Sequence, residues 1–194
     1  MIQYLQYIVF LGAAISFSGT IFYIKETLSG DTKPNKVTWL MWSMAPIIAT
    51  FAAVSDGVGW SVLPVFMAGF GPLLVFISSF VNKNSYWKLE IFDYVCCFLS
   101  ALALVFWFIT KEPAITIIFA IASDGFAAVP TLIKSWKYPE TETGYAYIAG
   151  ILAALTSFVA ITTWNFSSYA FPLYLIFINT CLIFSVYKNK LKLF

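Results

Sequence analysis

Seven apolar runs, each long enough to cross a lipid bilayer as a helix, occupy most of this sequence. A bilayer core about 30 Å thick requires about 20 consecutive apolar residues per helix. Short segments with Gly, Pro, Asp and Lys separate the runs, so each run predicts one spanning helix and each break predicts a loop. The expected spans are residues 4–24, 36–56, 60–81, 89–110, 113–134, 144–163 and 167–187.

The composition predicts an all-α membrane protein and argues against several other classes. Hydrophobic residues make up 61% of the chain and charged residues 10%, whereas soluble domains carry about 25% charged residues. We therefore expect neither a soluble enzyme, nor a disordered protein, nor a nucleic-acid binder. The chain has no His and no Arg, and its cysteines (Cys96, Cys97 and Cys181) lie inside apolar runs. This predicts no catalytic His, no metal site, no cofactor and no disulfide framework.

The distribution of lysines predicts how the helices are oriented. Cytoplasmic loops of membrane proteins carry an excess of Lys and Arg. If the N-terminus is outside, only Lys111 falls on the outer side. We therefore expect an N-out, C-in, multi-pass protein of the plasma (inner) membrane, with the lipid bilayer as a partner. The lysines of the inner loops and tail are then Lys25, Lys33, Lys36, Lys83, Lys88, Lys134, Lys137, Lys188, Lys190 and Lys192.

The sequence contains a weak internal repeat. At an offset of 105 residues, segment 34–42 falls on segment 139–147, and each segment opens a span after an inner loop. Pro64 and Pro172 match at an offset of 108, in the third and seventh spans. Two halves that both start outside form a parallel repeat, related by an axis along the membrane normal. The predicted organisation is a first triple-helix repeat at 1–81, a linker helix at 82–112, and a second triple-helix repeat with a short basic tail at 113–194.

The second half resembles the second repeat of SWEET and PQ-loop transporters. In the stretch 124–137, Pro130 is followed by the polar Thr131 near the inner end of a span, and a short basic loop comes next. The segment 141–145, TETGY, is similar to the Thr/Ser-x-Gly-Tyr opening of the following helix in that family. Neither half has a literal Pro-Gln pair. The resemblance implies a 3+1+3 arrangement of seven helices, an N-out orientation and transport of small solutes.

Asp124 is the main polar exception within the predicted spans. It lies about ten residues from either end of the fifth span, or roughly 15 Å of helix rise. An ionisable group at this depth is unfavourable unless it is solvated, paired or protonated. We expect Asp124 to bind substrate or to carry a proton. The alternative is a protonated, structural Asp held by a neighbouring Ser or a backbone carbonyl.

Three further residues are candidates for the same substrate site. Asn179 lies at a similar depth in the seventh span, and the resemblance implies that it lines the central pocket. The alternative for Asn179 is hydrogen bonding between helices. Trp42 and Tyr147 occupy matching positions of the repeat, and their rings can stack on sugars or attract cations. The alternative for both aromatic residues is ordinary packing or a place in the interfacial belt.

Prolines inside the predicted spans are candidate hinges for gating. Proline lacks a backbone N–H and permits a kink in a helix. Alternating access would use such kinks, and static kinks tolerated by packing are the alternative. The candidates are Pro46, Pro72, Pro130 and Pro172.

Together these features predict a membrane transporter. One acid, one amide and aromatic walls suit a small neutral or amino-bearing solute, sugar-like first, moved by alternating access of two three-helix halves. The alternative is a seven-helix ligand-binding receptor on the same fold without solute transport. A lone deep carboxylate makes no catalytic set, so no enzyme is expected. The expected partners are a small-molecule solute and, if Asp124 titrates, protons, with no nucleic acid, while a homo-oligomer stays open.

Overall fold

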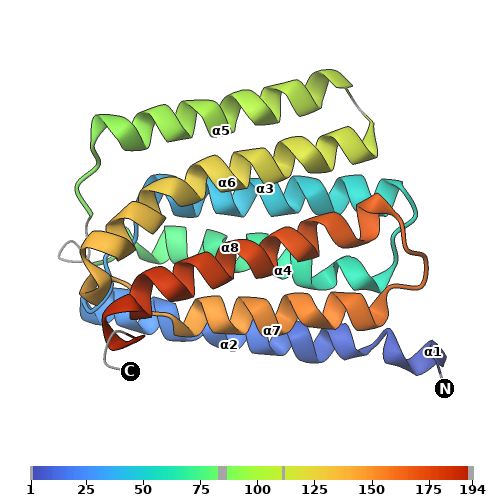
Figure 1. The fold of residues 1–194 in the computed structure, drawn as a ribbon, viewed down its shortest axis with the longest axis horizontal. Coiled ribbons are helices and arrows are strands. Elements are labelled where there is room, and N and C mark those ends of the chain that lie inside the picture. The colour runs from blue at the N-terminus through green and yellow to red at the C-terminus, as the bar shows by residue number, and fades with distance from the viewer. Residues whose placement is uncertain (1, 83–86, 111, 192–194) are drawn as a thin grey trace.

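The computed structural model describes residues 2–82, 87–110 and 112–191, and this part of the chain forms helices and no strands. Its seven long helices run side by side with roughly parallel axes (Figure 1). The short elements are α1 (Ile2–Leu5), η1 (Trp60–Val62) and η3 (Pro139–Thr141). The long helices are α2 (Ile8–Ser29), α3 (Lys36–Ser55), α4 (Leu63–Ser78), α5 (Ile91–Thr110), α6 (Pro113–Lys137), α7 (Tyr145–Ala160) and α8 (Phe166–Leu191).

Several of these helices are long and apolar enough to cross a membrane, which confirms the predicted all-α class. Within the described residues the five that meet this criterion are Ile8–Ser29, Lys36–Ser55, Trp60–Ser78, Pro113–Lys137 and Phe166–Lys188. Helix α7 is apolar but shorter, with 16 residues. Large apolar side chains also point outward, as expected where lipid surrounds the helices, and examples are Phe51, Phe98 and Phe177.

The long helices pack in a pattern that occurs twice. Helix α4 packs against α2 and α3, and α8 packs against α6 and α7. We call α2, α3 and α4 the first helix group, and α6, α7 and α8 the second. The groups meet along two helix pairs, α2 with α7 and α3 with α6. If α2, α3 and α4 are exchanged with α6, α7 and α8, respectively, the same set of helix pairs results. Helix α5 lies at one edge of the bundle against α6 (Figure 1).

Side-chain hydrogen bonds hold α3 against its neighbours. Thr38 Oγ1 donates to the Ala127 carbonyl of α6 at 2.8 Å, and Thr131 Oγ1 of α6 donates to Thr38 Oγ1 at 3.0 Å. Asn35 caps the first turn of α3 through its Oδ1, and its Nδ2 donates to the buried Asp93 of α5 at 2.7 Å. The start of α3 is therefore tied to the second group and to α5.

Helices α2 and α7 approach each other closely at Gly19. A Cβ atom added at Gly19 would lie 2.7 Å from the Cβ of Ala149, and 3.2 Å from the Cα of Ala146. Neither neighbour is the flexible end of a long side chain, so one helix would have to move. Small residues at such positions let helix backbones approach in membrane proteins.

Replacing Gly19 by alanine is therefore expected to lower the free energy of unfolding by about 1–3 kcal/mol, the usual cost of overpacking. Gly125→Ala in α6 is the matched control, because its new Cβ would meet only the Tyr174 hydroxyl, at an ordinary 3.7 Å. Alanine also favours a helix interior by about 0.8–1 kcal/mol over glycine, so the control should be at least as stable as the parent. Thermal unfolding in detergent measures both, and equal melting temperatures for the two variants would contradict the close approach.

Candidate functional site

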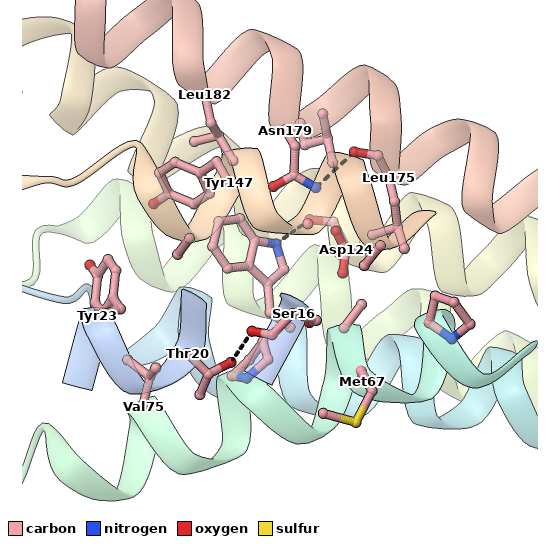
Figure 2. A pocket seen from close by; sticks show the side chains of 18 of the residues that line it. Ser16, Thr20, Tyr23, Met67, Val75, Asp124, Tyr147, Leu175, Asn179 and Leu182 are labelled. Atoms are coloured by element: carbon pink, nitrogen blue, oxygen red, sulfur yellow. Dashed lines mark hydrogen bonds between the residues drawn. The ribbon is translucent and has the colours of Figure 1, made fainter. Parts of the chain in front are cut away.

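A cavity of about 90 Å³ lies between the two helix groups. Every long helix except α5 contributes to its lining. The four substrate-binding candidates from the sequence all line it: Trp42 on α3, Asp124 on α6, Tyr147 on α7 and Asn179 on α8. Figure 2 labels the last three of them around the cavity. The fold thus brings together residues that lie far apart in the sequence.

Asp124 is the charged side chain of this cavity. It is buried, and Tyr174 donates its hydroxyl to Oδ2 at 2.7 Å. Trp42 Nε1 donates to the backbone carbonyl of Asp124 at 3.2 Å, so this bond leaves the carboxylate unused. Carboxylate Oδ1 makes no hydrogen bond to any described residue, and no Lys is among the described residues that line the cavity. Beyond the Tyr174 hydroxyl, a carboxylate in this setting needs water, a proton or a cationic ligand to stabilise it.

Asn179 faces the cavity from α8. Its Nδ2 donates to the Leu175 carbonyl one turn earlier in the same helix, at 2.8 Å. Gly150 of α7 lies opposite, and a Cβ atom added there would come within 3.1 Å of Asn179 Nδ2. The glycine therefore leaves the space that the amide occupies, and Asn179 Oδ1 is left to accept a hydrogen bond from a ligand.

Aromatic rings form one wall of the cavity. The rings of Trp39 and Trp42 meet edge to face, with centroids 5.3 Å apart and planes at 82°. Trp42 and Tyr147 meet at 6.4 Å and 81°, and Tyr23 packs on Trp39 at 4.5 Å. All four residues line the cavity and are buried. Through the Nε1 of Trp42 this wall contacts the backbone of Asp124, and aromatic walls of this kind bind sugars or cations in proteins.

The four candidate hinge prolines occupy different positions relative to the cavity. Each lies inside a long helix that continues past it: Pro46 in α3, Pro72 in α4, Pro130 in α6 and Pro172 in α8. Of the four, Pro72 lines the cavity. The other three lie elsewhere in the helices that carry Trp42, Asp124 and Asn179, and the hinge role of all four prolines stays a prediction.

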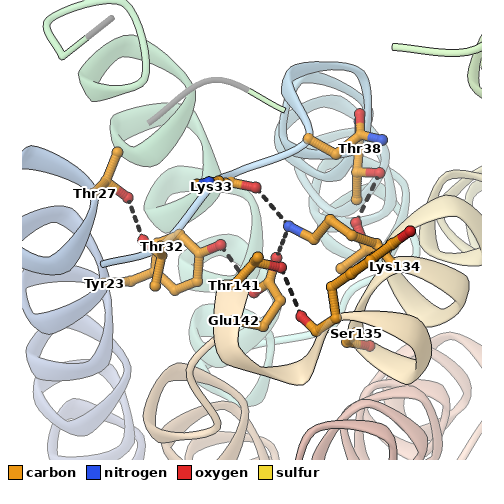
Figure 3. A network of polar contacts seen from close by, with 12 residues as sticks. Tyr23, Thr27, Thr32, Lys33, Thr38, Lys134, Ser135, Thr141 and Glu142 are labelled. Carbon is orange, nitrogen blue, oxygen red and sulfur yellow. Dashed lines mark hydrogen bonds and ion pairs between the residues drawn. The ribbon is translucent and has the colours of Figure 1, made fainter. Parts of the chain in front are cut away.

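A buried ion pair lies at one end of the helix bundle, next to two tyrosines of the cavity, and the sequence interpretation missed it. We call this end the lysine-rich end, because lysines that the count places on the inner side, Lys33 and Lys134 among them, lie here. The loops 30–35 and 138–144 form it. Lysine counting placed Lys134 in an inner loop, but Lys134 lies buried in the last turns of α6. Its Nζ pairs with Glu142 Oε1 and donates to the Lys33 carbonyl at 2.5 Å (Figure 3). Lys134 therefore connects the loops 30–35 and 138–144 and is not a solvated loop residue.

Glu142 also receives two tyrosine hydroxyls. Tyr23 of α2 donates to its Oε2 at 2.9 Å (Figure 3), and Tyr147 of α7 donates to the same oxygen at 2.8 Å. We call Tyr23, Lys134, Glu142 and Tyr147 the Glu142 network. Both tyrosines also line the cavity, so the network borders the cavity at its lysine-rich end. It connects the first helix group, through Tyr23 and the Lys33 carbonyl, to the second.

No family model, no curated protein and no solved structure matches this chain. The fold and the site therefore define the class of protein by themselves. It is an all-α protein with helices long and apolar enough to cross a membrane, built around a cavity that carries one carboxylate, one amide and an aromatic wall. Within the described residues, no group of three or more His, Cys, Asp or Glu side chains comes together.

Proposed function

We propose that this chain is a membrane transporter that moves a small neutral or amino-bearing solute by alternating access of two three-helix halves. The halves are the first and second helix groups, and α5 is the linker between them. Support comes from the packing, which is unchanged when the groups are exchanged. The resemblance to SWEET and PQ-loop transporters favours the same 3+1+3 plan, with sugar-like solutes first among the candidates.

The observation that carries the proposal is the composition of the cavity. Trp42 comes from the first half, and Asp124, Tyr147 and Asn179 come from the second, so a bound solute contacts both halves at once. A site divided between two moving bodies is what alternating access requires. The lone carboxylate, with no lysine among the described lining residues, disfavours an anionic solute.

The Glu142 network supplies the closed end of the proposed cycle. Under the lysine rule the lysine-rich end faces the cytoplasm of a plasma-membrane protein, so this arrangement is closed toward the cytoplasm. Opening this end would separate Tyr23 and the Lys33 carbonyl, on the first half, from Glu142 and Lys134, on the second. Hydrogen bonds to charged groups contribute about 1.5–3 kcal/mol each. A few such bonds are a barrier that solute binding can offset.

Uptake into proteoliposomes tests the proposal. We expect saturable uptake, above that of protein-free liposomes, for at least one solute among labelled glucose, sucrose, neutral amino acids and small amines. Uptake should also show counterflow when the same unlabelled solute is loaded inside. Each solute is measured with and without an inward proton gradient, which reports proton coupling. A solute that raises the melting temperature of the protein but never crosses the membrane would contradict transport and support the receptor alternative.

A further inference from the structure

We infer that the cavity binds an organic ammonium ion that carries no carboxylate, such as a small amine or amino alcohol. The inference rests on the proposed function for its transport step, and it narrows the solute from the sugar-like class to the amino-bearing class. It is carried by the hydrogen-bonding character of the cavity, where acceptors face the space and most donors are already used.

The donors of the cavity are directed into the protein. The indole of Trp42 donates to a carbonyl of α6, and the amide nitrogen of Asn179 donates to a carbonyl of its own helix. The hydroxyls of Tyr23 and Tyr147 both donate to Glu142. Trp42, Tyr23 and Tyr147 thus have no donor to offer a ligand, and Asn179 keeps only the second N–H of its amide.

The acceptors remain available. Asp124 Oδ1 and Asn179 Oδ1 make no hydrogen bond to the described residues. In two lining residues, Trp42 and Ala68, the backbone carbonyl lacks the usual N–H donor four residues later, because a proline stands at that position in both helices. The cavity therefore offers a carboxylate and several neutral acceptors, which suits a solute rich in N–H groups or bearing a positive charge.

The charge and the aromatic wall favour the same ligand. The Trp42 indole bonds at the Asp124 backbone, so a cation beside this carboxylate also lies near the ring. Aromatic faces with a nearby carboxylate are how proteins recognise quaternary and primary ammonium groups. A carboxylate on the solute would find no cation, because Lys134 is held by Glu142 and by the Lys33 carbonyl.

Two donors of the lining are still directed at no described partner. They are the hydroxyl of Ser16 and the second N–H of the Asn179 amide. A pair of neutral donors can satisfy the oxygen of one hydroxyl of an amino alcohol. A sugar could donate its O–H groups to the acceptors around Asp124, but its several hydroxyl oxygens would find too few donors in the lining. The ligand chemistry that satisfies the most lining groups is therefore one ammonium group with one hydroxyl or none.

Isothermal titration of the protein in lipid nanodiscs tests this inference with choline and ethanolamine as probes. Two compounds match choline closely: 3,3-dimethylbutan-1-ol replaces the charged nitrogen by carbon, and glycine betaine replaces the alcohol by a carboxylate. We expect choline or ethanolamine to bind at least tenfold more tightly than both matched compounds and than glucose. Equal binding of the uncharged compound, tighter binding of betaine or glucose, or no binding of either amine would overturn the inference.

The variant arm locates the binding. Asp124→Asn should weaken binding of the amine at least tenfold, because it removes the counter-charge and keeps an oxygen that can accept from Tyr174. Asp56→Asn, on an exposed loop residue at the opposite end of the bundle, should leave binding unchanged. An Asp124→Asn protein that melts like the parent and binds the amine as well would overturn the inference.

The two proposals fail in different ways. Amine binding without uptake would remove the transport function and leave the ligand class standing. Saturable uptake of glucose, with no binding of either amine, would remove the ligand class and leave transport standing.

Discussion

Glu142→Gln is expected to lower the free energy of unfolding by about 3–5 kcal/mol, the usual cost of breaking a buried ion pair from one side. The variant keeps the size of the side chain and an oxygen for the tyrosine hydroxyls. It removes the charge that compensates Lys134, which is buried at 2% exposure. Chemical or thermal unfolding of the purified protein in detergent, followed by circular dichroism, measures the change.

The control for this prediction lies two residues away. Glu140 is exposed in the same loop, and Glu140→Gln should change stability by no more than about 0.5 kcal/mol. A second variant, Lys134→Met with Glu142→Gln, removes both charges and should recover at least half of the loss, because an apolar side chain tolerates the buried site. If Glu142→Gln and Glu140→Gln melt alike, the ion pair does not hold this end of the bundle closed.

The helices themselves could be predicted from run length and punctuation. Backbone polar groups have no water to bond in a bilayer core, so an apolar run of the right length must be helical. The run expected at 144–163 is α7 (Tyr145–Ala160), and its loop begins close to where the apolar pattern ends. The site followed from depth along these helices, since Asp124 and Asn179 were expected at a similar level and both line the cavity.

The Glu142 network could not be predicted, because its members are selected by how separate segments meet. Tyr23 and Glu142 are 119 residues apart, and only the packing of α2 against α7 brings them together. The lysine count orients the chain by treating every lysine near a span end as solvated, and Lys134 is included in that count. A partner eight residues away, across a short turn, makes burial possible. The lysine count still leaves nine inner lysines against one when Lys134 is set aside (10 − 1 = 9).

The internal repeat also shows where sequence equivalence stops. At the offset of 105, Gly19 corresponds to Asp124. Gly19 lies against Ala149 of α7 and allows the close approach of two helices, whereas Asp124 faces the cavity. Equivalent positions therefore serve packing in one half and polarity in the other. A cavity at the interface of two similar halves needs only one carboxylate, and a second buried charge of the same sign would be unfavourable.

Asp124→Asn is expected to lower the initial rate of solute uptake at least tenfold while the protein stays folded. The amide has the size of the carboxylate and can still accept from Tyr174, so the packing of α6 against α8 should survive. It loses the negative charge and turns N–H donors toward a cavity whose other polar groups are largely acceptors. Losing one member of a buried charge pair costs about 2–5 kcal/mol, and about 1.4 kcal/mol already corresponds to a tenfold change.

The measurement compares proteoliposomes that contain equal amounts of the parent, Asp124→Asn and Asp56→Asn proteins. The exposed Asp56 lies outside the cavity, so its variant should transport like the parent. Melting temperatures of the three proteins separate a transport defect from a folding defect. If Asp124→Asn transports at the parental rate, the carboxylate is a structural partner of Tyr174, and the polar centre of the site must then be sought at Asn179. If uptake is lost and the melting temperature is kept, the carboxylate acts on the solute, because no described ion pair of the fold depends on it.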